Sequence, residues 1–302
     1  MEKGKRVQII IGIACVNLAT FAWATNMVIG RWLRDSAGPV TISAVRFIIA
    51  SMLFAAILRH LPRQERSMGK DKWLIIAMAV TGVMLFSPIL YLGLRYTTAV
   101  NSTIINGFSP LVTGLLAAWL IHEPLSARQI GGSVLAMLGV VLLISGGSFA
   151  FWSTSNINAG DLIVLAAVTM WGLYSVCGGK VMRNRSSLSA TALSTLIGTP
   201  ALCLLAVIEI QYIPVSLDWK VLLALVYVGV VPAAAGFYAW NKGVARLGPA
   251  GATVFMNMLP VYGALLGIIF LDEPLGFLHV AGGLLIISGG LLAALKRQRA
   301  GS

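Results

Sequence analysis

Residues 248–275 read GPAGATVFMNMLPVYGALLGIIFLDEPL, a long apolar run that ends with an acidic pair followed by a proline. Residues 98–125 read TAVNSTIINGFSPLVTGLLAAWLIHEPL and repeat this pattern in the first half of the chain. Pro110 matches Pro260, and the Glu-Pro-Leu of residues 123–125 matches that of residues 273–275. We therefore interpret the chain as an internal duplication.

Further pairs of identical residues follow at a nearly constant separation along the two halves. They are Trp23 and Trp171, Gly30 and Gly178, Gly82 and Gly229, Tyr91 and Tyr238, Gly132 and Gly282, and Gly139 and Gly289. Because these pairs extend over almost the whole chain, we predict two related units, residues 1–147 and residues 148–302.

The composition indicates an integral membrane protein. Hydrophobic residues make up 58% of the 302 residues and charged residues 11%, whereas an ordinary soluble domain is about a quarter charged. The three cysteines, Cys15, Cys177 and Cys203, lie singly in apolar stretches, without the paired spacing that is typical of a metal site. We expect neither a metal nor a cofactor.

A membrane-spanning helix needs about 20 mostly apolar residues. Ten stretches meet this condition: residues 8–30, 40–59, 73–94, 98–120, 129–147, 160–181, 188–208, 219–241, 249–270 and 277–295. The sequence thus predicts an all-α integral membrane protein with ten transmembrane helices, five in each repeat.

The basic residues predict the orientation of these helices. With the N-terminus inside, the outer segments carry only Arg31, Arg34, Arg95 and Lys220, and Arg46 lies within the second span, while all other Lys and Arg residues fall on the inner side. This asymmetry predicts a multi-pass protein with both termini in the cytoplasm. The net charge of +12 is then a topology signal, and we expect no nucleic-acid partner.

An odd number of spans in each repeat means that the second repeat enters the membrane upside down. Inverted repeats around a central cavity near the membrane midplane are the architecture of many secondary transporters. The alternative is a duplicated structural bundle with no transport role.

Polar side chains inside a membrane mark cavities or helix contacts, because an unpaired polar group in lipid is costly. They concentrate on spans one, three and four, and on the equivalent spans six, eight and nine. The residues predicted to bind substrate are Trp23, Asn26, Tyr91, Asn106, Trp171, Tyr174, Tyr238 and Asn257. Amides and hydroxyls can hold a zwitterion, and aromatic faces can pack on an apolar portion. The alternative for each residue is interhelical hydrogen bonding.

Four prolines interrupt these same spans: Pro88, Pro110, Pro232 and Pro260. Each removes one backbone hydrogen bond, so these positions are either bending points for gating or static kinks. Arg46 is interpreted as a structural residue that reaches outward or binds carbonyl groups, and the alternative is attraction of a substrate carboxylate. No span has a carboxylate near its centre, which predicts downhill transport or coupling through groups that the sequence does not reveal. The same shortage leaves few residues for enzyme chemistry.

Spans five and ten carry glycines instead of polar residues. Gly132, Gly139 and Gly146 recur at every second helical turn of the fifth span, as Gly282 and Gly289 do in the tenth. Small residues at this spacing allow two helices to approach closely. We therefore predict that these two spans form a scaffold.

The repeated ending of spans four and nine, together with FYAWNKGVARLGPAGATVFMNMLPVYGALLGIIFLDEPL at residues 237–275, resembles the EamA-type exporters of the drug/metabolite transporter superfamily. The resemblance covers almost the whole chain and is strongest to bacterial exporters of aromatic amino acids. It implies export of amino acids, aromatic or otherwise apolar, and of related metabolites by alternating access across the bacterial inner (plasma) membrane. The expected partners are the lipid bilayer and a small-molecule substrate, without an obligate protein partner. The alternatives are export of another small metabolite or drug, and a membrane-embedded enzyme.

Overall fold

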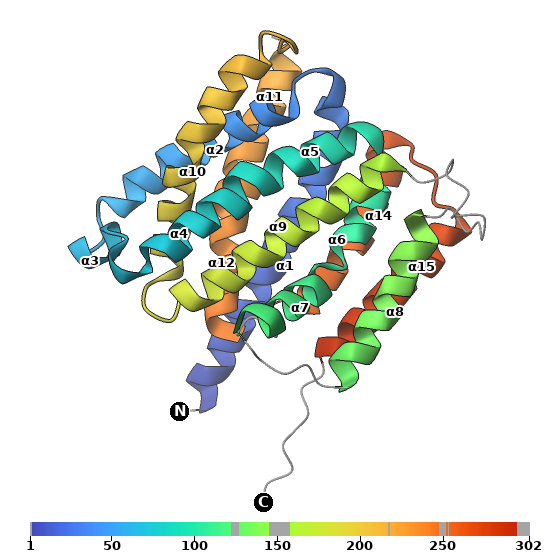
Figure 1. Cartoon of the computed structure of the whole chain (residues 1–302), viewed down its shortest axis with the longest axis horizontal. Helices are drawn as coiled ribbons and strands as arrows, with labels where there is room; N and C mark the ends of the chain where they lie inside the picture. Colours follow the sequence, from blue (N-terminus) through green and yellow to red (C-terminus); the bar gives the residue numbers. More distant parts are fainter. Residues whose placement is uncertain are drawn as a thin grey trace, which may run out of the picture.

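In the computed structural model, the described residues are 2–121, 127–144, 158–216, 218–247, 252 and 254–294, and every regular element among them is a helix. Seven helical runs are long and apolar enough to cross a membrane, and three shorter apolar helices, Ile130–Gly139, Leu259–Leu271 and Phe277–Gly289, match the remaining predicted spans. The described part of the chain therefore contains ten apolar segments in a single helical bundle (Figure 1). The predicted boundary between residues 147 and 148 lies outside the described residues.

The first half begins with α1 (Glu2–Trp32) and α2 (Pro39–Leu58). The third span combines α4 (Lys72–Met78), the π-helical segment η3 (Ala79–Leu85) and α5 (Phe86–Tyr96). The fourth span consists of α6 (Ala99–Asn106) and α7 (Ser109–Ile121), and the fifth is α8 (Ala127–Ile144). Short helical turns connect these spans: η1 (Leu33–Asp35), α3 (Arg63–Arg66) and η2 (Gly69–Asp71).

The second half repeats this order. It contains α9 (Ala159–Val181) and α10 (Ser187–Glu209), then α11 (Trp219–Val228), the π-helical segment η5 (Gly229–Gly236) and α12 (Phe237–Leu247). The ninth span comprises the short 3₁₀ segment η6 (Val254–Met258) and α14 (Leu259–Leu271), and the tenth is α15 (Phe277–Ala294).

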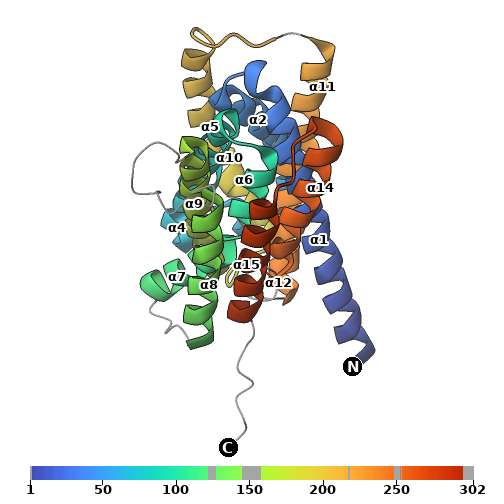
Figure 2. The ribbon, with the colours of Figure 1, turned by 90° about the vertical axis from the view of Figure 1, so that its right-hand side faces the viewer.

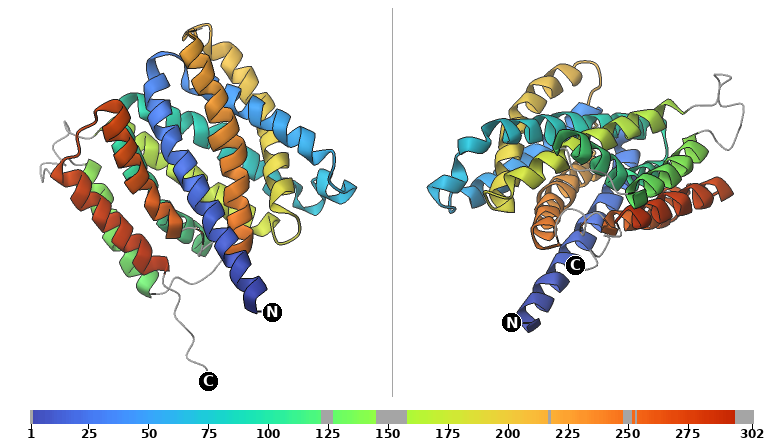
Figure 3. Two further views of the ribbon diagram at one scale, coloured as in Figure 1. Left: turned by 180° about the vertical axis from the view of Figure 1, so that it is seen from behind. Right: turned by 60° about the horizontal axis from the view of Figure 1, so that its bottom comes forward.

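The contacts between the halves are related by a pseudo-two-fold axis. Helix α1 packs against α12 and α14, just as the equivalent α9 packs against α5 and α7, while α2 packs on its own counterpart α10, and α8 on α15. Figure 3 shows α1 running beside α12, with α8 and α15 as a separate pair at the edge of the bundle. Because each half crosses the membrane five times, this axis lies in the membrane plane and the repeats are inverted. The beginning of α1 and the end of α15 accordingly lie on the same side (Figure 2).

Helices α2 and α10 meet at the axis through equivalent hydroxyl groups. Ser51 Oγ lies 2.8 Å from Thr199 Oγ1. The ends of the same two helices are tied to the opposite half by carboxylates. Glu209, at the end of α10, accepts hydrogen bonds from the backbone N–H groups of Val40 (3.1 Å) and Thr41 (2.7 Å) in the first turn of α2. A carboxylate at a helix N-terminus satisfies unpaired amides and complements the positive end of the helix dipole.

The opposite end of α10 is held in a similar way by the first half. The Glu65 carboxylate accepts hydrogen bonds from the backbone N–H of Ser186, at the start of α10, and from its hydroxyl (2.8 Å). Beside it, Arg185 Nε pairs with Asp71 Oδ2 at 3.2 Å, and both side chains are at most 10% exposed. The two halves are thus joined by carboxylates at both ends of the bundle.

The third and eighth spans share an irregularity that the hydrophobic pattern does not reveal. Both contain a π-helical segment, η3 and η5, in which the hydrogen-bond ladder shifts; Phe86 N, for example, donates to Thr81 O, five residues earlier. Pro232 lies inside η5, and Pro88 follows η3 in the first turn of α5. Since proline has no N–H to donate, the regular ladder is already incomplete at these positions.

The other two prolines lie at helix starts. Pro110 is the second residue of α7, directly after the break that follows Asn106, and Pro260 is the second residue of α14. The missing N–H of a proline costs nothing in the first turn of a helix, where that group has no intrahelical partner. The four prolines therefore interrupt their spans in two symmetric ways, and their gating role remains a prediction.

The expected close packing of spans five and ten is confirmed. A Cβ atom added to Gly139 would lie 2.6 Å from the carbonyl oxygen of Gly282, and one added to Gly289 would lie 2.5 Å from that of Gly132. In both cases the obstacle is backbone, which cannot turn aside as a side chain can. Gly146 lies outside the described residues.

We predict that Gly289→Ala destabilises the protein by about 1–3 kcal/mol, because the methyl group overpacks the backbone contact with α8. The measurement is the melting temperature of the purified protein in detergent. Gly283→Ala on the same helix is the matched control, since its Cβ would meet nothing within 4 Å. Equal melting temperatures for the two variants would contradict the close approach.

Candidate functional site

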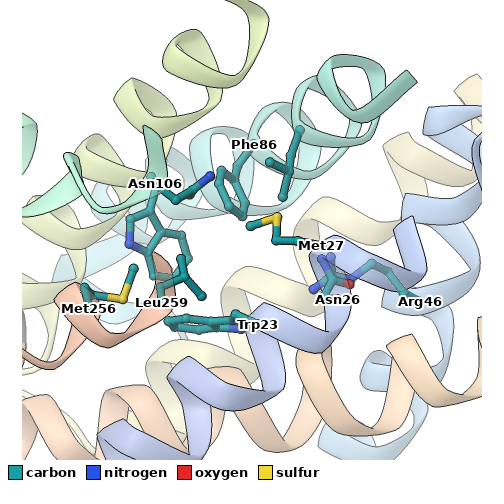
Figure 4. A pocket seen from close by; sticks show the side chains of 10 residues that line it. Trp23, Asn26, Met27, Arg46, Phe86, Asn106, Met256 and Leu259 are labelled. Atoms are coloured by element: carbon teal, nitrogen blue, oxygen red, sulfur yellow. The ribbon is translucent and has the colours of Figure 1, made fainter. Parts of the chain in front are cut away.

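A narrow cavity lies between the two halves, close to the helix breaks. It is lined by ten residues from α1, α2, α5, α6, α9, η6 and α14: Trp23, Asn26, Met27, Arg46, Phe86, Leu90, Asn106, Trp171, Met256 and Leu259 (Figure 4). The side chains leave little space among them that is wide enough for a water molecule. A solute the size of an amino acid therefore requires the walls to move apart.

The aromatic wall is centred on the symmetry-related indoles of Trp23 and Trp171. Their ring centroids lie 5.1 Å apart in an edge-to-face arrangement. Trp171 also contacts Phe86, at 5.1 Å between ring centroids, and stacks on Tyr174, at 5.0 Å. Such pairs each contribute about 0.5–1.5 kcal/mol beyond the area they bury. The repeat therefore brings two residues that are far apart in the chain into one wall.

The backbone irregularity of the eighth span holds one of these indoles in place. Trp23 Nε1 donates a hydrogen bond to the carbonyl oxygen of Pro232, in η5, at 3.1 Å. A π-helical segment and a proline leave carbonyl groups available that a regular helix would use internally. The cavity wall is thus fixed by a bond between the two halves.

The polar wall is a chain of three side chains from α1, α2 and α5. Arg46 Nη1 donates to Tyr91 Oη (3.1 Å), which in turn donates to Asn26 Oδ1 (2.6 Å). All three residues are at most 2% exposed. Tyr91 belongs to this network without lining the cavity, so its hydroxyl orients the two side chains that do.

The four remaining predicted residues differ in their relation to the cavity. Asn106, the last residue of α6, lines the cavity and donates from Nδ2 to the Ser102 carbonyl at 2.9 Å. Tyr174 stacks on the lining residue Trp171 and accepts a hydrogen bond from Asn241 Nδ2 at 3.3 Å, while Tyr238 does not line the cavity and has the Lys242 ammonium 5.3 Å from its ring centroid. Asn257 falls in η6, but its side chain lies outside the described part of the chain.

Several lining residues are absent from the predicted substrate site. Arg46 is one of them, although a basic residue inside a span is a visible signal and attraction of a carboxylate is the stated alternative to its structural role. Met27, Phe86, Leu90, Met256 and Leu259 gave no signal, because an apolar residue in an apolar helix looks the same whether it faces lipid or a cavity. Only the packing of the helices separates these two environments.

Comparison with known proteins identifies the family. The model of the EamA-like transporter family matches residues 10–145 and again residues 158–295. The chain belongs to the EamA-like transporter family. It is therefore a multi-pass membrane transporter of the drug/metabolite transporter superfamily, with two EamA repeats, and its substrates are small molecules.

Named relatives and a solved structure agree with this membership. The chain is 28% identical to "Uncharacterized transporter YyaM" of Bacillus subtilis over 85% of this chain and 84% of that protein. It is 26% identical to "Probable terminal-alkyne amino-acid exporter" of Streptantibioticus cattleyicolor over 94% and 95%. A crystal structure with 19% identity matches at a TM-score of 0.63 over 96% of this chain and 97% of the other, which shows a shared fold.

The polar wall leads to a stability prediction. We expect Tyr91→Phe to lower the free energy of unfolding by about 1–2 kcal/mol, because it removes the bonds to Arg46 and Asn26 from a dry site. The measurement is the melting temperature in detergent. Tyr96→Phe on the same helix is the control, since Tyr96 is 60% exposed. If the two variants have equal melting temperatures, the hydrogen bonds of the Tyr91 hydroxyl do not stabilise the protein.

Proposed function

We propose that this EamA-family transporter exports amino acids with aromatic or other apolar side chains, and related metabolites, by alternating access. The observation that supports the proposal is the cavity between the inverted halves, which has an aromatic wall and a polar wall. Aromatic faces suit a ring or a branched apolar side chain, and amide groups suit the charged ends of a zwitterion. The relative from Streptantibioticus cattleyicolor is named "Probable terminal-alkyne amino-acid exporter", which supports amino acids as the class of substrate.

Alternating access is supported by the connections at the two ends of the bundle. At one end, Glu273 accepts hydrogen bonds from Ala99 N and Val100 N at the start of α6, both at 2.9 Å, and Glu209 holds the start of α2. At the other end, Glu65 and Asp71 of the first half hold α10 and Arg185 of the second. Because the cavity is narrow, a solute reaches it when the halves rock apart at one end while the opposite end stays joined.

The proposed orientation places the beginning of α1 and the end of α15 in the cytoplasm of a bacterial cell. Both lie on one side of the bundle, and the basic connecting segments accumulate on that side in the sequence. Glu65 and the Asp71–Arg185 pair then lie at the cytoplasmic end, and Glu209 and Glu273 lie at the outer end. Export consequently requires the cytoplasmic connections to open first.

The cavity predicts which variant loses transport. Trp171 and Trp240 are each 3% exposed and belong to the same aromatic cluster, but only Trp171 lines the cavity. We expect Trp171→Leu to reduce transport of L-tryptophan and L-phenylalanine about tenfold and that of L-alanine less, since it removes an aromatic face.

The assay is counterflow of radiolabelled amino acids into proteoliposomes loaded with unlabelled solute. Trp240→Leu is the matched control for the loss of a buried indole, and Ser288→Ala on the scaffold helix α15 is a neutral control. A wild type that moves none of the amino acids would refute the proposed substrate class, and equal losses in both Trp variants would argue against this cavity.

A second prediction concerns energy coupling. The described residues that line the cavity include no carboxylate and no histidine, so no group there carries a proton between the two sides near neutral pH. We expect proteoliposomes to export amino acid down its own gradient at the same rate with equal pH on both sides and with an imposed pH gradient. Flux that appears only with the gradient would contradict this expectation.

A further inference from the structure

Arg46 stands out among the cavity residues because its charge is buried without a counter-ion. The residue is 1% exposed, and among the described residues no carboxylate forms an ion pair with it. Its Nε atom is buried and has no hydrogen-bond partner. A buried charge in this state is costly unless an anion compensates it.

The groups around Arg46 orient the guanidinium but do not neutralise it. Nη1 donates to the hydroxyls of Tyr91 and Ser87, at 3.1 and 3.4 Å. The guanidinium carbon lies 5.1 Å from the ring centroid of Phe47 and 5.7 Å from that of Tyr91. Uncharged hydroxyls and ring faces leave the net charge in place, and part of the planar donor set is unused.

The second repeat has no equivalent charge. The position that corresponds to Arg46 on α10 is Ser194, whose hydroxyl donates to the Thr191 carbonyl oxygen of its own helix at 3.1 Å. A two-fold cavity would otherwise offer a solute two equal orientations. The single arginine makes one side of the cavity cationic and therefore distinguishes the two ends of a solute.

We propose that Arg46 binds the carboxylate of the transported solute. This inference rests on the proposed function and specifies it further: the substrate carries an anionic group, and its apolar portion packs on Trp23 and Trp171. A guanidinium binds a carboxylate through two parallel N–H donors, and such charge-assisted bonds are strong in a water-poor site. Asn26, held beside Arg46 through Tyr91, adds an amide at the same end.

The opposite side of the cavity suits the ammonium group of an amino acid. Figure 4 shows Asn106 well separated from Arg46, with Phe86 and Met27 between them. The Nδ2 of Asn106 is already bonded to the Ser102 carbonyl, so its side-chain oxygen is the atom that remains to accept a hydrogen bond. A cation-binding oxygen at one end and a guanidinium at the other match a zwitterion.

The first experiment needs no variant and uses four probes of one shape: L-phenylalanine, 3-phenylpropionate, L-phenylalaninamide and 2-phenylethylamine. Binding to the purified wild-type protein is measured by isothermal titration calorimetry in detergent. We expect the two carboxylates to bind about ten- to a hundredfold more tightly than the amide and the amine, which is the effect of one hydrogen bond to a charged group. Equal binding of acid and amide, tighter binding of the amine, or binding of none of the four overturns the proposal.

The second experiment compares variants. Arg46→Met should weaken L-phenylalanine binding by the same ten- to hundredfold factor and leave the amide unchanged, whereas Arg46→Lys should retain part of the preference. Arg246→Met is the matched control, because Arg246 lies at the end of α12, outside the cavity, where its Nε donates a hydrogen bond to Gln8 of α1. If Arg46→Met binds acid and amide in the wild-type ratio, the proposal fails; if the variant does not fold, the wild-type ratio decides.

The two proposals can fail separately. A wild type that prefers 3-phenylpropionate to the amine but transports no amino acid supports the role of Arg46 and refutes amino-acid export. A wild type that transports amino acids and their amides equally well supports the proposed function in its coarser form and refutes carboxylate binding by Arg46.

Discussion

Backbone amides and carbonyls inside a lipid bilayer have no water to bind, and the rest of this structure depends on how the chain meets that constraint. Regular helices satisfy it within themselves, and irregular backbone is stable only where protein or a cavity surrounds it. The π-helical segments η3 and η5 and the break after Asn106 all lie in the spans of the inner walls. The Pro232 carbonyl is paired with the Trp23 indole. Irregularity and cavity therefore occur together for one physical reason.

The inverted duplication explains why the same features appear twice. One duplication yields two π-helical segments, two helices with a proline at their second position, and two indoles that meet between the halves. Symmetric walls make the free energies of the inward-open and outward-open arrangements of the halves similar. Alternating access requires this similarity, because both arrangements must be populated. Residues that differ between the two repeats can then distinguish one end of the solute from the other. The clearest difference is Arg46, whose equivalent in the second repeat is Ser194.

The two kinds of helix pair between the halves differ in the contacts that hold them. Helices α8 and α15 approach through glycine backbone, beside side chains such as Ile286 and Ala136, and the backbone part of this contact cannot rearrange as a side chain can. Helices α2 and α10, with the segments at their ends, are instead joined to the opposite half through hydroxyls, carboxylates and one arginine, as at Ser51–Thr199 and Glu209–Thr41. A hydrogen bond can be exchanged for another during a rotation of the halves, whereas a backbone contact at this distance resists sliding. The α8–α15 pair therefore suits a scaffold, and the α2–α10 pair suits movement between the halves.

The sequence by itself determined the membrane environment, the ten apolar segments, the duplication and its inversion, because these follow from composition and from an odd number of spans. It also indicated Trp23, Asn26, Asn106 and Trp171, which line the cavity, since polar and aromatic residues inside a span are visible in the chain. The tertiary structure alone decided that Tyr238 does not line the cavity and that Arg46 lines it without a counter-ion among the described residues. It also revealed the apolar lining residues. The reason is geometric: a helix has a lipid face and an inner face, and its rotation about its own axis is set by packing against neighbours that are distant in sequence.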